Sequence, residues 1–197
     1  MTSHRPYHHG DLRAALLGAA LDSIADGGLA ALSLRKVAAR AGVSHTAAGY
    51  HFGDKAGLLT AIAVEGYRRL GAELEAAGRG GGFLDVGVAY VNFAVTNRAY
   101  FEVMFRPELH HRNGGDLRQA RARTAEMLYG TDTPTSEQLA DGVAAWAIVH
   151  GLATLWLDDN LPTQLGDDPT TVTRLVASRL RRRRGFDRRT RGLPRPR

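Results

Sequence analysis

The amino-acid sequence predicts an all-α fold, with a small N-terminal helical head and a larger C-terminal helical bundle. Three observations support this prediction. Apolar residues recur every three or four positions along most of the 197 residues, as on one face of a helix. No alternating apolar and polar run bounded by turns indicates a strand. The clearest break, Gly-Arg-Gly-Gly-Gly at 78–82, divides the helical patterns into two groups.

The first helix is expected from Asp11, after a polar arm at residues 1–10 that we predict to be mobile. Its apolar stripe recurs every four residues: Leu12, Leu16, Ala20 and Ile24. Gly27 or Gly28 can take the left-handed conformation that ends a helix. Ser33 and Ser44 are suitable N-caps for a second and a third, shorter helix. Asp54 is placed to cap a fourth helix, which we predict over 55–77.

The second and third helices are separated by a tight turn that contains Gly42, the arrangement that a helix-turn-helix requires. Ala38 is small enough for the third helix to cross closely, and Gly42 accepts a positive φ. The outward residues near the third helix are donors with almost no acid nearby: His45, Thr46, Tyr50, His51 and Lys55. A helix of this kind can enter a major groove of DNA. The alternative is an ordinary pair of antiparallel helices inside a bundle.

The stretch Ala-Leu-Ser-Leu-Arg-Lys-Val-Ala-Ala-Arg-Ala-Gly-Val-Ser, followed by His-Thr-Ala-Ala-Gly-Tyr-His-Phe-Gly-Asp-Lys-Ala-Gly-Leu-Leu, resembles the DNA-binding domain of the TetR family of bacterial transcriptional regulators. The resemblance implies a helix-turn-helix DNA-binding domain at 11–54, a connecting helix at 55–77, and a ligand-binding and dimerisation domain at 83–184. It places four residues nearest the bases: Arg35, His45, Thr46 and Ala47. Ser33, His51 and Lys55 would hold the DNA backbone, beside the capping residue Ser44.

One position departs from the family pattern. Gly49 stands where the family usually has a phosphate-contacting tyrosine, and Tyr50 follows it. Either Tyr50 makes that contact from another angle, or the contact is lost. A glycine inside so short a helix also costs about 1 kcal/mol relative to alanine.

Beyond the glycine-rich break, helical patterns are expected at 83–97, 99–105, 115–129, 137–158 and 169–184. The 137–158 helix is apolar nearly all round, so it must be covered on both sides. One stripe is expected to face the interior: Leu139, Val143, Trp146, His150 and Ala153. The residues expected at a homodimer interface are mostly small: Ala140, Ala144, Ala147, Gly151, Leu155, and Leu175 of the next helix. The Trp-His-Gly spacing resembles a C-terminal domain type of the same family.

A ligand cavity in the C-terminal domain is implied by the resemblance. Its candidate lining residues are Phe93, Phe101, Met104, Phe105, Trp146 and His150. The alternative is that these residues are core, because an aromatic and methionine stripe at helical spacing packs a core more often than a pocket. The expected effector is a small, largely apolar molecule.

The composition of the chain excludes several kinds of functional site. The chain has no cysteine, which excludes disulfides, thiolate metal sites and cysteine nucleophiles. We expect no metal and no cofactor, because the histidine pairs are adjacent in sequence and point apart. The start of the chain lacks the apolar core of a signal peptide, and the longest apolar run, 143–157, is too short to cross a bilayer. A cytoplasmic protein without a membrane partner is expected, associated with the nucleoid when bound to DNA.

The charge is concentrated at the C-terminal end. The last 19 residues contain ten arginines and one aspartate, a charge of +9, and subtracting this from the total of +6 leaves −3 for the first 178 residues. DNA binding must therefore rest on local geometry. We predict that residues 185–197 form a disordered, Arg-rich tail, because Gly185, Pro194 and Pro196 interrupt any helix there.

The predicted function is a homodimeric repressor that binds a palindromic double-stranded operator and is released by its effector. Three alternatives stay open: an activator of the same fold, a helical adaptor or ligand-binding protein without sequence-specific DNA binding, and a small enzyme that uses His150 with a carboxylate. We do not expect an enzyme, because the sequence contains no recognisable set of nucleophile, base and orienting group.

Overall fold

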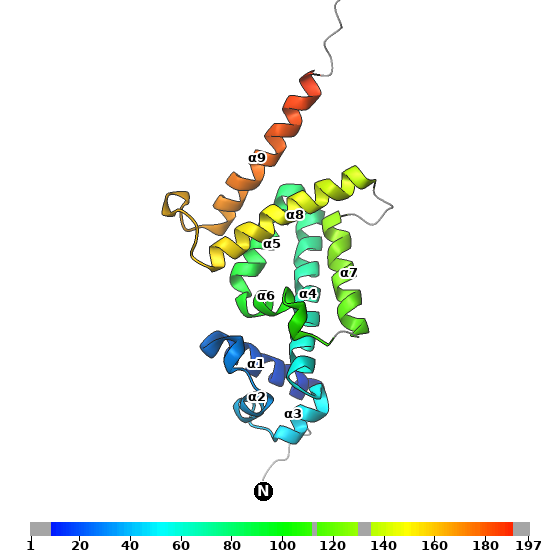
Figure 1. The fold of residues 1–197 in the computed structure, drawn as a ribbon, viewed down its shortest axis with the longest axis vertical. Coiled ribbons are helices and arrows are strands. Elements are labelled where there is room, and N and C mark those ends of the chain that lie inside the picture. Colours follow the sequence, from blue (N-terminus) through cyan, green and yellow to red (C-terminus); the bar gives the residue numbers. More distant parts are fainter. Residues whose placement is uncertain (1–8, 112–113, 130–134, 191–197) are drawn as a thin grey trace, which may run out of the picture. The chain divides into compact units, whose positions relative to one another are not determined.

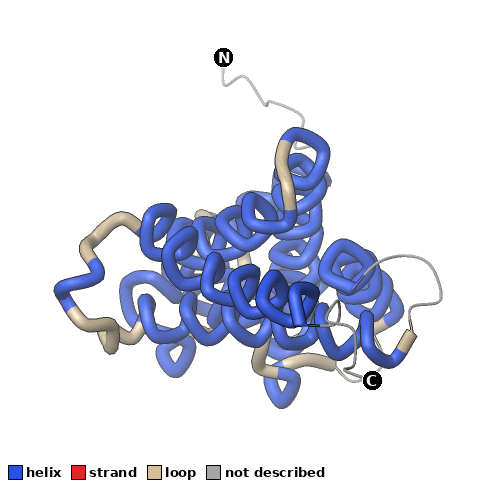
Figure 2. The backbone as a smooth tube through the Cα atoms, turned by 90° about the horizontal axis from the view of Figure 1, so that it is seen from above, coloured by secondary structure: helices blue, strands red, loops and turns tan. Residues whose placement is uncertain are grey.

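The structure is a computed structural model that describes residues 9–111, 114–129 and 135–190. All regular elements in these ranges are helical, which confirms the predicted all-α class (Figure 2). The helices in chain order are α1 (His9–Ala31), α2 (Leu34–Arg40), α3 (His45–Phe52), α4 (Lys55–Gly80), α5 (Phe83–Thr96), α6 (Arg98–Met104), α7 (Gly115–Tyr129), α8 (Ser136–Leu157) and α9 (Pro169–Thr190) (Figure 1). Two short 3₁₀ turns, η1 (Pro107–Leu109) and η2 (Thr163–Leu165), lie between them.

The chain folds as two compact units. The first unit combines α1, α2, α3 and the start of α4 with Arg98–Arg121, and the second combines Arg69–Asn97 with the chain from Ala122 onward. The sequence predicts that 98–121 belongs to the C-terminal domain, whereas the structure packs it into the first unit. Gly66 of α4 allows this packing, because a Cβ there would lie 2.6 Å from the Met104 sulfur of α6.

The helix boundaries in the first unit follow from caps and glycines. Gly28 has φ 70° and ψ 174°, which interrupts α1 at the predicted position, although a further turn continues to Ala31. The Ser33 hydroxyl accepts a hydrogen bond from the Lys36 amide at 3.3 Å and starts α2. The Ser44 hydroxyl accepts from the Ala47 amide at 3.1 Å and starts α3. Both serines are therefore the predicted N-caps.

The core of the first unit is built from small and aliphatic side chains at helical spacing. Those with no exposed surface include Leu16, Val37, Ala48, Leu58 and Ile62. These residues come from α1, α2, α3 and α4, so each of the first four helices contributes a buried stripe to one core. Ala48 is small enough for α3 to lie close against the others.

The second unit packs α5 against α8 and α9. Val91 and Ala94 of α5 and Ala153 of α8 are fully buried, and Val172 of α9 is almost so. Polar contacts fix α9 on α5: an Arg174 guanidinium nitrogen donates to the Asp85 carboxylate at 2.6 Å, and the Asn92 amide donates to the Thr170 hydroxyl at 3.0 Å. This packing holds one side of α8 and leaves its other side uncovered within the unit.

Both chain ends differ from the sequence-based prediction where the structure describes them. The α1 helix begins at His9, inside the predicted arm, and residues 1–8 lie outside the described residues. The α9 helix continues through Gly185 to Thr190, so the predicted disordered tail is helical over its first six residues. One glycine costs about 1 kcal/mol in a helix, which the good helix formers around it can offset. Residues 191–197 lie outside the described residues.

By length and composition alone, Leu12–Ala31 and Ser136–Leu157 are long and apolar enough to cross a membrane. The second of these helices extends beyond the 15-residue apolar run that the sequence shows. In the two apolar windows, 28% and 22% of the residues are buried within the chain. Most residues of both windows are therefore not buried within the described chain.

Candidate functional site

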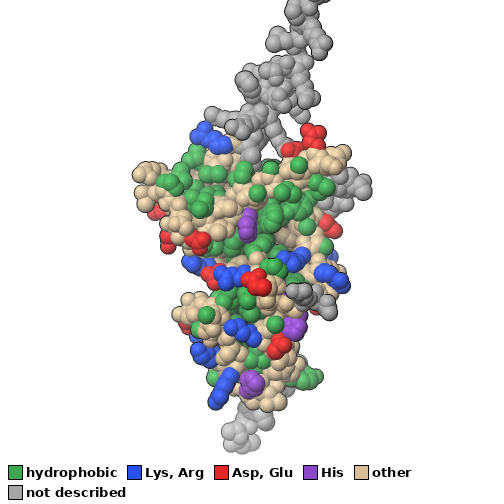
Figure 3. Space-filling view, in the orientation of Figure 1, with side chains coloured by type: hydrophobic (Ala, Val, Ile, Leu, Met, Phe, Trp, Pro, Cys, Tyr) green, Lys and Arg blue, Asp and Glu red, His purple; other side chains and the backbone are tan. Residues whose placement is uncertain are grey.

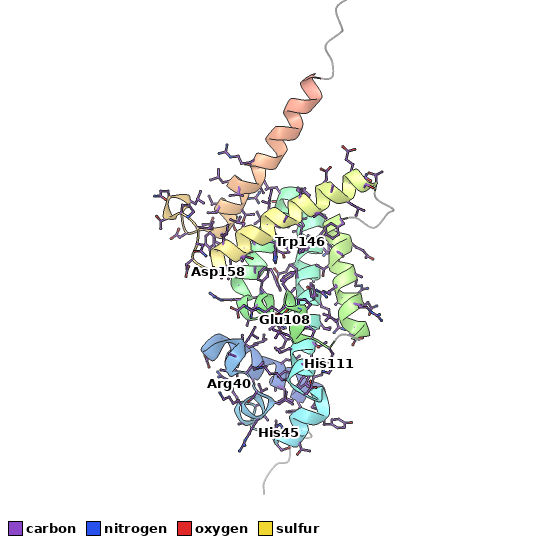
Figure 4. The ribbon with its side chains drawn as sticks, in the orientation of Figure 1. Arg40, His45, Glu108, His111, Trp146 and Asp158 are labelled. Carbon is purple, nitrogen blue, oxygen red and sulfur yellow. The ribbon has the colours of Figure 1, made fainter. Side chains whose placement is uncertain are left out.

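The α3 helix presents one side to solvent from the first unit. Ala48 and Phe52 are buried and anchor the inner side. His45 and Thr46 at the start of the helix are exposed, and Figure 4 shows His45 at that end. The N-terminal turn of a recognition helix is the part that contacts base edges. The exposed residues of α3 are thus in the position that base contacts require.

The turn before α3 has helix-turn-helix geometry. Gly42 has φ 71°, a conformation that side chains disfavour. The amides of Gly42 and Val43 donate to the carbonyls of Ala39 and Ala38, at 3.1 and 3.0 Å. These bonds satisfy the C-terminal carbonyls of α2 and turn the chain directly into α3.

A glycine also fixes the junction from α3 to α4. A Cβ on Gly57 would lie 1.9 Å from the Phe52 carbonyl oxygen, so no other residue fits without moving the backbone. The Asp54 carboxylate caps α4 by accepting from the Gly57 amide at 2.8 Å, as predicted for this residue. The Gly57 amide is the main reason that the pKa of Asp54 is lowered, and the side chain of His111 adds to it.

The His111 contact is one that the sequence does not reveal. The Nε2 of His111 lies 2.9 Å from the Asp54 carboxylate, and its backbone amide donates to the Thr60 hydroxyl at 2.9 Å. The two side chains are 57 residues apart in sequence, and no local pattern joins them. The segment after α6 is therefore attached to the start of α4, next to the junction with α3.

The basic residues of the first unit are in different environments. Arg40 is held on α1 by Asp26 at 2.6 Å and Asp22 at 3.6 Å, which raises its pKa, chiefly through the Asp26 hydrogen bond. Arg35 and Lys36 on α2 are exposed and, among the described residues, form no ion pair. Acids of the head are thus engaged by Arg40 and His111, and the outward cations of α2 remain available for phosphate or base contacts.

Some predicted DNA-contacting residues have structural partners. Lys55 is exposed, and its ammonium donates to the Leu29 carbonyl at 3.0 Å. An ammonium has three donors, so this bond leaves capacity for a phosphate. Ala47 and His51 are half-buried on α3. The half-buried Ser33 hydroxyl acts as a cap.

The departure at Gly49 has a clear structural setting. A Cβ on Gly49 would meet no atom within 4 Å, so the fold does not require glycine there. Tyr50 is 86% exposed and its ring lies edge-on to the ring of His51, with centroids 5.7 Å apart. Exposing the apolar face of this ring to water is unfavourable, so covering it with a binding partner would lower the free energy.

The second unit contains an apolar cavity of about 90 Å³. Its walls come from α5, α7, α8 and α9: Phe83, Leu84, Val86, Gly87, Tyr90, Met127, Leu128, Gly142, Ala145, Trp146, Val149 and Ala177. The α5 contribution follows one face of the helix, because 83, 87 and 90 are at helical spacing. Phe83 is 62% exposed, which places a large apolar ring in contact with solvent.

A hydrogen-bonded set of three side chains borders this cavity. The Trp146 indole donates to the Tyr90 hydroxyl at 3.1 Å, and that hydroxyl lies 2.8 Å from Nδ1 of His150 (Trp146 is labelled in Figure 4). Burial lowers the pKa of His150, which favours the uncharged ring. In that form an unprotonated Nδ1 can accept a hydrogen bond from the Tyr90 hydroxyl. Tyr90 thus joins two residues that the sequence singled out.

The predicted lining residues do not all meet at the cavity. Trp146 lines it, and His150 lies behind Tyr90. Phe93 is buried in the second unit without lining the cavity. Phe101, Met104 and Phe105 belong to the first unit, where the Tyr67 hydroxyl donates to the Met104 carbonyl at 3.0 Å and the two phenylalanine rings pack 4.9 Å apart. Sequence reasoning missed Tyr90, although its spacing from Phe83 and Gly87 was a usable signal.

The outer side of α8 is apolar and exposed. Figure 3 shows hydrophobic side chains gathered over this helix. Five of the six residues predicted at a dimer interface are exposed and Gly151 is half-buried: Ala140, Ala144, Ala147, Gly151, Leu155 and Leu175.

The predicted interior stripe of α8 is wrong at two positions. Leu139 is 41% exposed and Val143 49% exposed, while Ala153 is buried. The side that α5 covers is centred on Val149 and Leu152, which turns Leu139 and Val143 outward.

Two family descriptions match the sequence. The one described as bacterial regulatory proteins, tetR family, matches residues 16–62, and the one described as tetracyclin repressor-like, C-terminal domain, matches residues 83–180. No curated protein matches the chain.

Solved structures share the fold over most of the chain. A protein of unknown function from Rhodococcus sp. RHA1 is 30% identical, with a TM-score of 0.75, and the match covers 91% of this chain and 98% of that one. NalD, the secondary repressor of the MexAB-OprM multidrug efflux pump in Pseudomonas aeruginosa, is 22% identical, with a TM-score of 0.59 and coverage of 88% and 95%. SmeT in complex with triclosan is 18% identical, with a TM-score of 0.58 and coverage of 86% and 89%.

Proposed function

We infer that this chain, which belongs to the TetR family of bacterial regulatory proteins and is a DNA-binding transcriptional regulator, acts in the cytoplasm as a homodimeric repressor released by a small molecule. The observation that carries the proposal is the outward, acid-free side of α3. Its inner residues are buried, both ends are fixed by caps or glycines, and its donors face solvent. Arg35, His45, Thr46 and Ala47 are the proposed base-contacting residues.

The proposed dimer is supported by α8. A helix whose apolar side is uncovered within its own chain needs a partner surface, and a second copy presents the same side. Ala140, Ala144, Ala147 and Gly151 allow another helix to approach closely, with Leu155 and Leu175 beside them. Two heads carried by one dimer would bind half-sites about one helical turn, or a multiple of it, apart.

The proposed release is a shift between two populations. A molecule in the second unit's cavity would favour a conformation in which the two heads no longer match the operator. It can do so only if it binds that conformation more tightly than the DNA-competent one. The α4 helix is continuous from Lys55 to Gly80 and takes part in both units, which makes it the proposed link. NalD is described as a repressor and SmeT as a complex with triclosan, which agrees with this mode.

The test of function is a mobility-shift assay with DNA from the region upstream of the protein's own gene. The unmodified protein is expected to retard this DNA in the presence of excess random DNA. The double variant Arg35→Ala, His45→Ala should lose that preference while the fold, followed by circular dichroism, is retained. Equal retardation of both DNAs by the unmodified protein would support the adaptor alternative. Transcription in vitro, with and without the protein, separates repression from activation.

A further inference from the structure

The cavity in the second unit has two properties that define the chemistry of its occupant. None of the twelve described residues that line it carries a formal charge, and only Tyr90 and Trp146 have polar side-chain atoms. Those atoms already bond to each other, and the Tyr90 hydroxyl also contacts His150. A charged ligand would lose its hydration there without gaining a counter-charge, and an isolated charge is costly to bury.

Two exposed residues of the cavity wall give a second observation. Phe83 and Met127 both line the cavity and are 62% and 40% exposed. Large apolar side chains exposed beside an apolar hollow are typical of a surface that a ligand covers. The rings of Phe83, Tyr90 and Trp146 supply faces and edges on which another ring can stack.

The size of the cavity limits the size of the ligand that it can hold. Its volume of about 90 Å³ is well below the roughly 300–1,000 Å³ typical of sites for drug-sized ligands. Gly87 and Gly142 let the helices around the cavity pack closely, because a Cβ on Gly87 would lie 3.2 Å from Val149 and one on Gly142 would lie 2.9 Å from the Tyr129 ring.

We propose that the cavity bordered by Tyr90 and Trp146 binds a compact, uncharged, single-ring aromatic molecule, and that it discriminates against charged molecules of the same shape. This assignment rests on the proposed function only for the consequence of binding, and the binding itself needs no DNA. Ring stacking and apolar burial supply the affinity, and the absence of charged lining residues supplies the selectivity.

The experiment uses three probes of similar shape: 4-methylphenol, benzoate and benzylamine. Isothermal titration calorimetry on the full chain without DNA is expected to give at least tenfold tighter binding for the uncharged probe. Ala145→Leu places a larger side chain in the cavity and should weaken the binding of 4-methylphenol at least tenfold. Ala76→Leu, an exposed position on α4 away from the cavity, is the matched control and should bind as the unmodified protein does.

A second measurement keeps the proposal testable if Ala145→Leu fails to fold. The chain has two tryptophans, so Trp156→Phe leaves Trp146 as the only fluorescent indole. Adding 4-methylphenol should change the fluorescence emission of Trp146 until the change saturates. Benzoate at the same concentration should leave that emission unchanged. Equal binding of the charged probes, no binding of 4-methylphenol, or an unchanged Trp146 emission would each overturn the proposal. If 4-methylphenol binds but operator DNA is not released, the release mechanism fails and the assignment of the cavity stands.

Discussion

The two arginines of α2 illustrate how single residues divide between DNA contact and structure. Arg40 is held by Asp22 and Asp26 of α1, whereas Arg35 is exposed and, within the described chain, has no acidic partner. A guanidinium without an internal partner can make a bidentate contact to a guanine edge. Sequence alone does not distinguish them, because the partners of Arg40 come from another helix.

Replacing Arg35 with alanine should therefore relax sequence preference. We expect a loss of about 1–3 kcal/mol on the preferred operator, with little change on random DNA, because one base contact is removed. Fluorescence anisotropy with both DNAs measures the two affinities. Arg40→Ala is the control, and it should lower the melting temperature without a selective loss of operator binding. Equal losses on both DNAs for Arg35→Ala would refute the base contact.

Lys55 is predicted to contact a DNA phosphate although it also bonds to the Leu29 carbonyl. Lys55→Ala should weaken binding to all DNA sequences alike. It should also reduce the slope of log affinity against log salt concentration by about one unit. Arg79→Ala removes a cation from the second unit, where it pairs with Glu75, and is expected to leave the slope unchanged. Binding is measured over a range of salt concentrations for the unmodified protein, Lys55→Ala and Arg79→Ala. An unaltered slope for Lys55→Ala would count against a phosphate contact by Lys55.

At the scale of elements, the sequence predicts which segments are helical better than how they pack. The N-caps Ser33 and Ser44 each accept from an amide three positions further along the chain, so local sequence is sufficient to place them. The covered side of α8 depends on α5, some 50 residues earlier, and the outward turn of Leu139 and Val143 could not be predicted locally. His111 was missed for the same reason, because its partner Asp54 is 57 residues away in sequence. The helical spacing of Tyr90 from Phe83 and Gly87 was a local signal, but its bonds to Trp146 and His150 join distant parts of the chain.

The junction between α3 and α4 provides a prediction at this scale. Gly57→Ala places a Cβ 1.9 Å from a backbone oxygen, so the backbone must shift, and we expect a loss of about 1–3 kcal/mol of stability with weaker DNA binding. Gly78→Ala, on the same helix, meets only a Val86 methyl at 3.7 Å and should be neutral or stabilise by about 0.5–1 kcal/mol. Urea denaturation compares the two, and equal effects would contradict the close approach at Gly57.

At the scale of the whole molecule, the exposed apolar side of α8 is the feature on which the proposed homodimer rests. The prediction that α8 is covered on both sides came from its composition, which is a property of the element and needs no contact information. The division of the chain was harder to predict, because Arg98–Arg121 joins the first unit through packing on Gly66 that only the tertiary structure reveals.

Introducing charge on this side of α8 should break the proposed dimer. The double variant Ala147→Glu, Gly151→Glu would bury unpaired carboxylates, which we expect to weaken association by about 3–5 kcal/mol. Sedimentation velocity should show a monomer for the double variant and a dimer for the unmodified protein. Ala76→Glu, an exposed position on α4, serves as the control and should remain dimeric. A dimer that survives the double substitution would show that the subunits associate through another surface.

The central claim is that α3 enters a major groove and that two copies do so on one stretch of DNA. Selection of bound sequences from a random DNA pool by the full chain tests it most directly. We expect an enriched palindrome whose half-sites are about one helical turn, or a multiple of it, apart, and Arg35→Ala should change the enriched bases within each half. A pool with no enriched sequence, or one with a single unpaired half-site, would contradict this account.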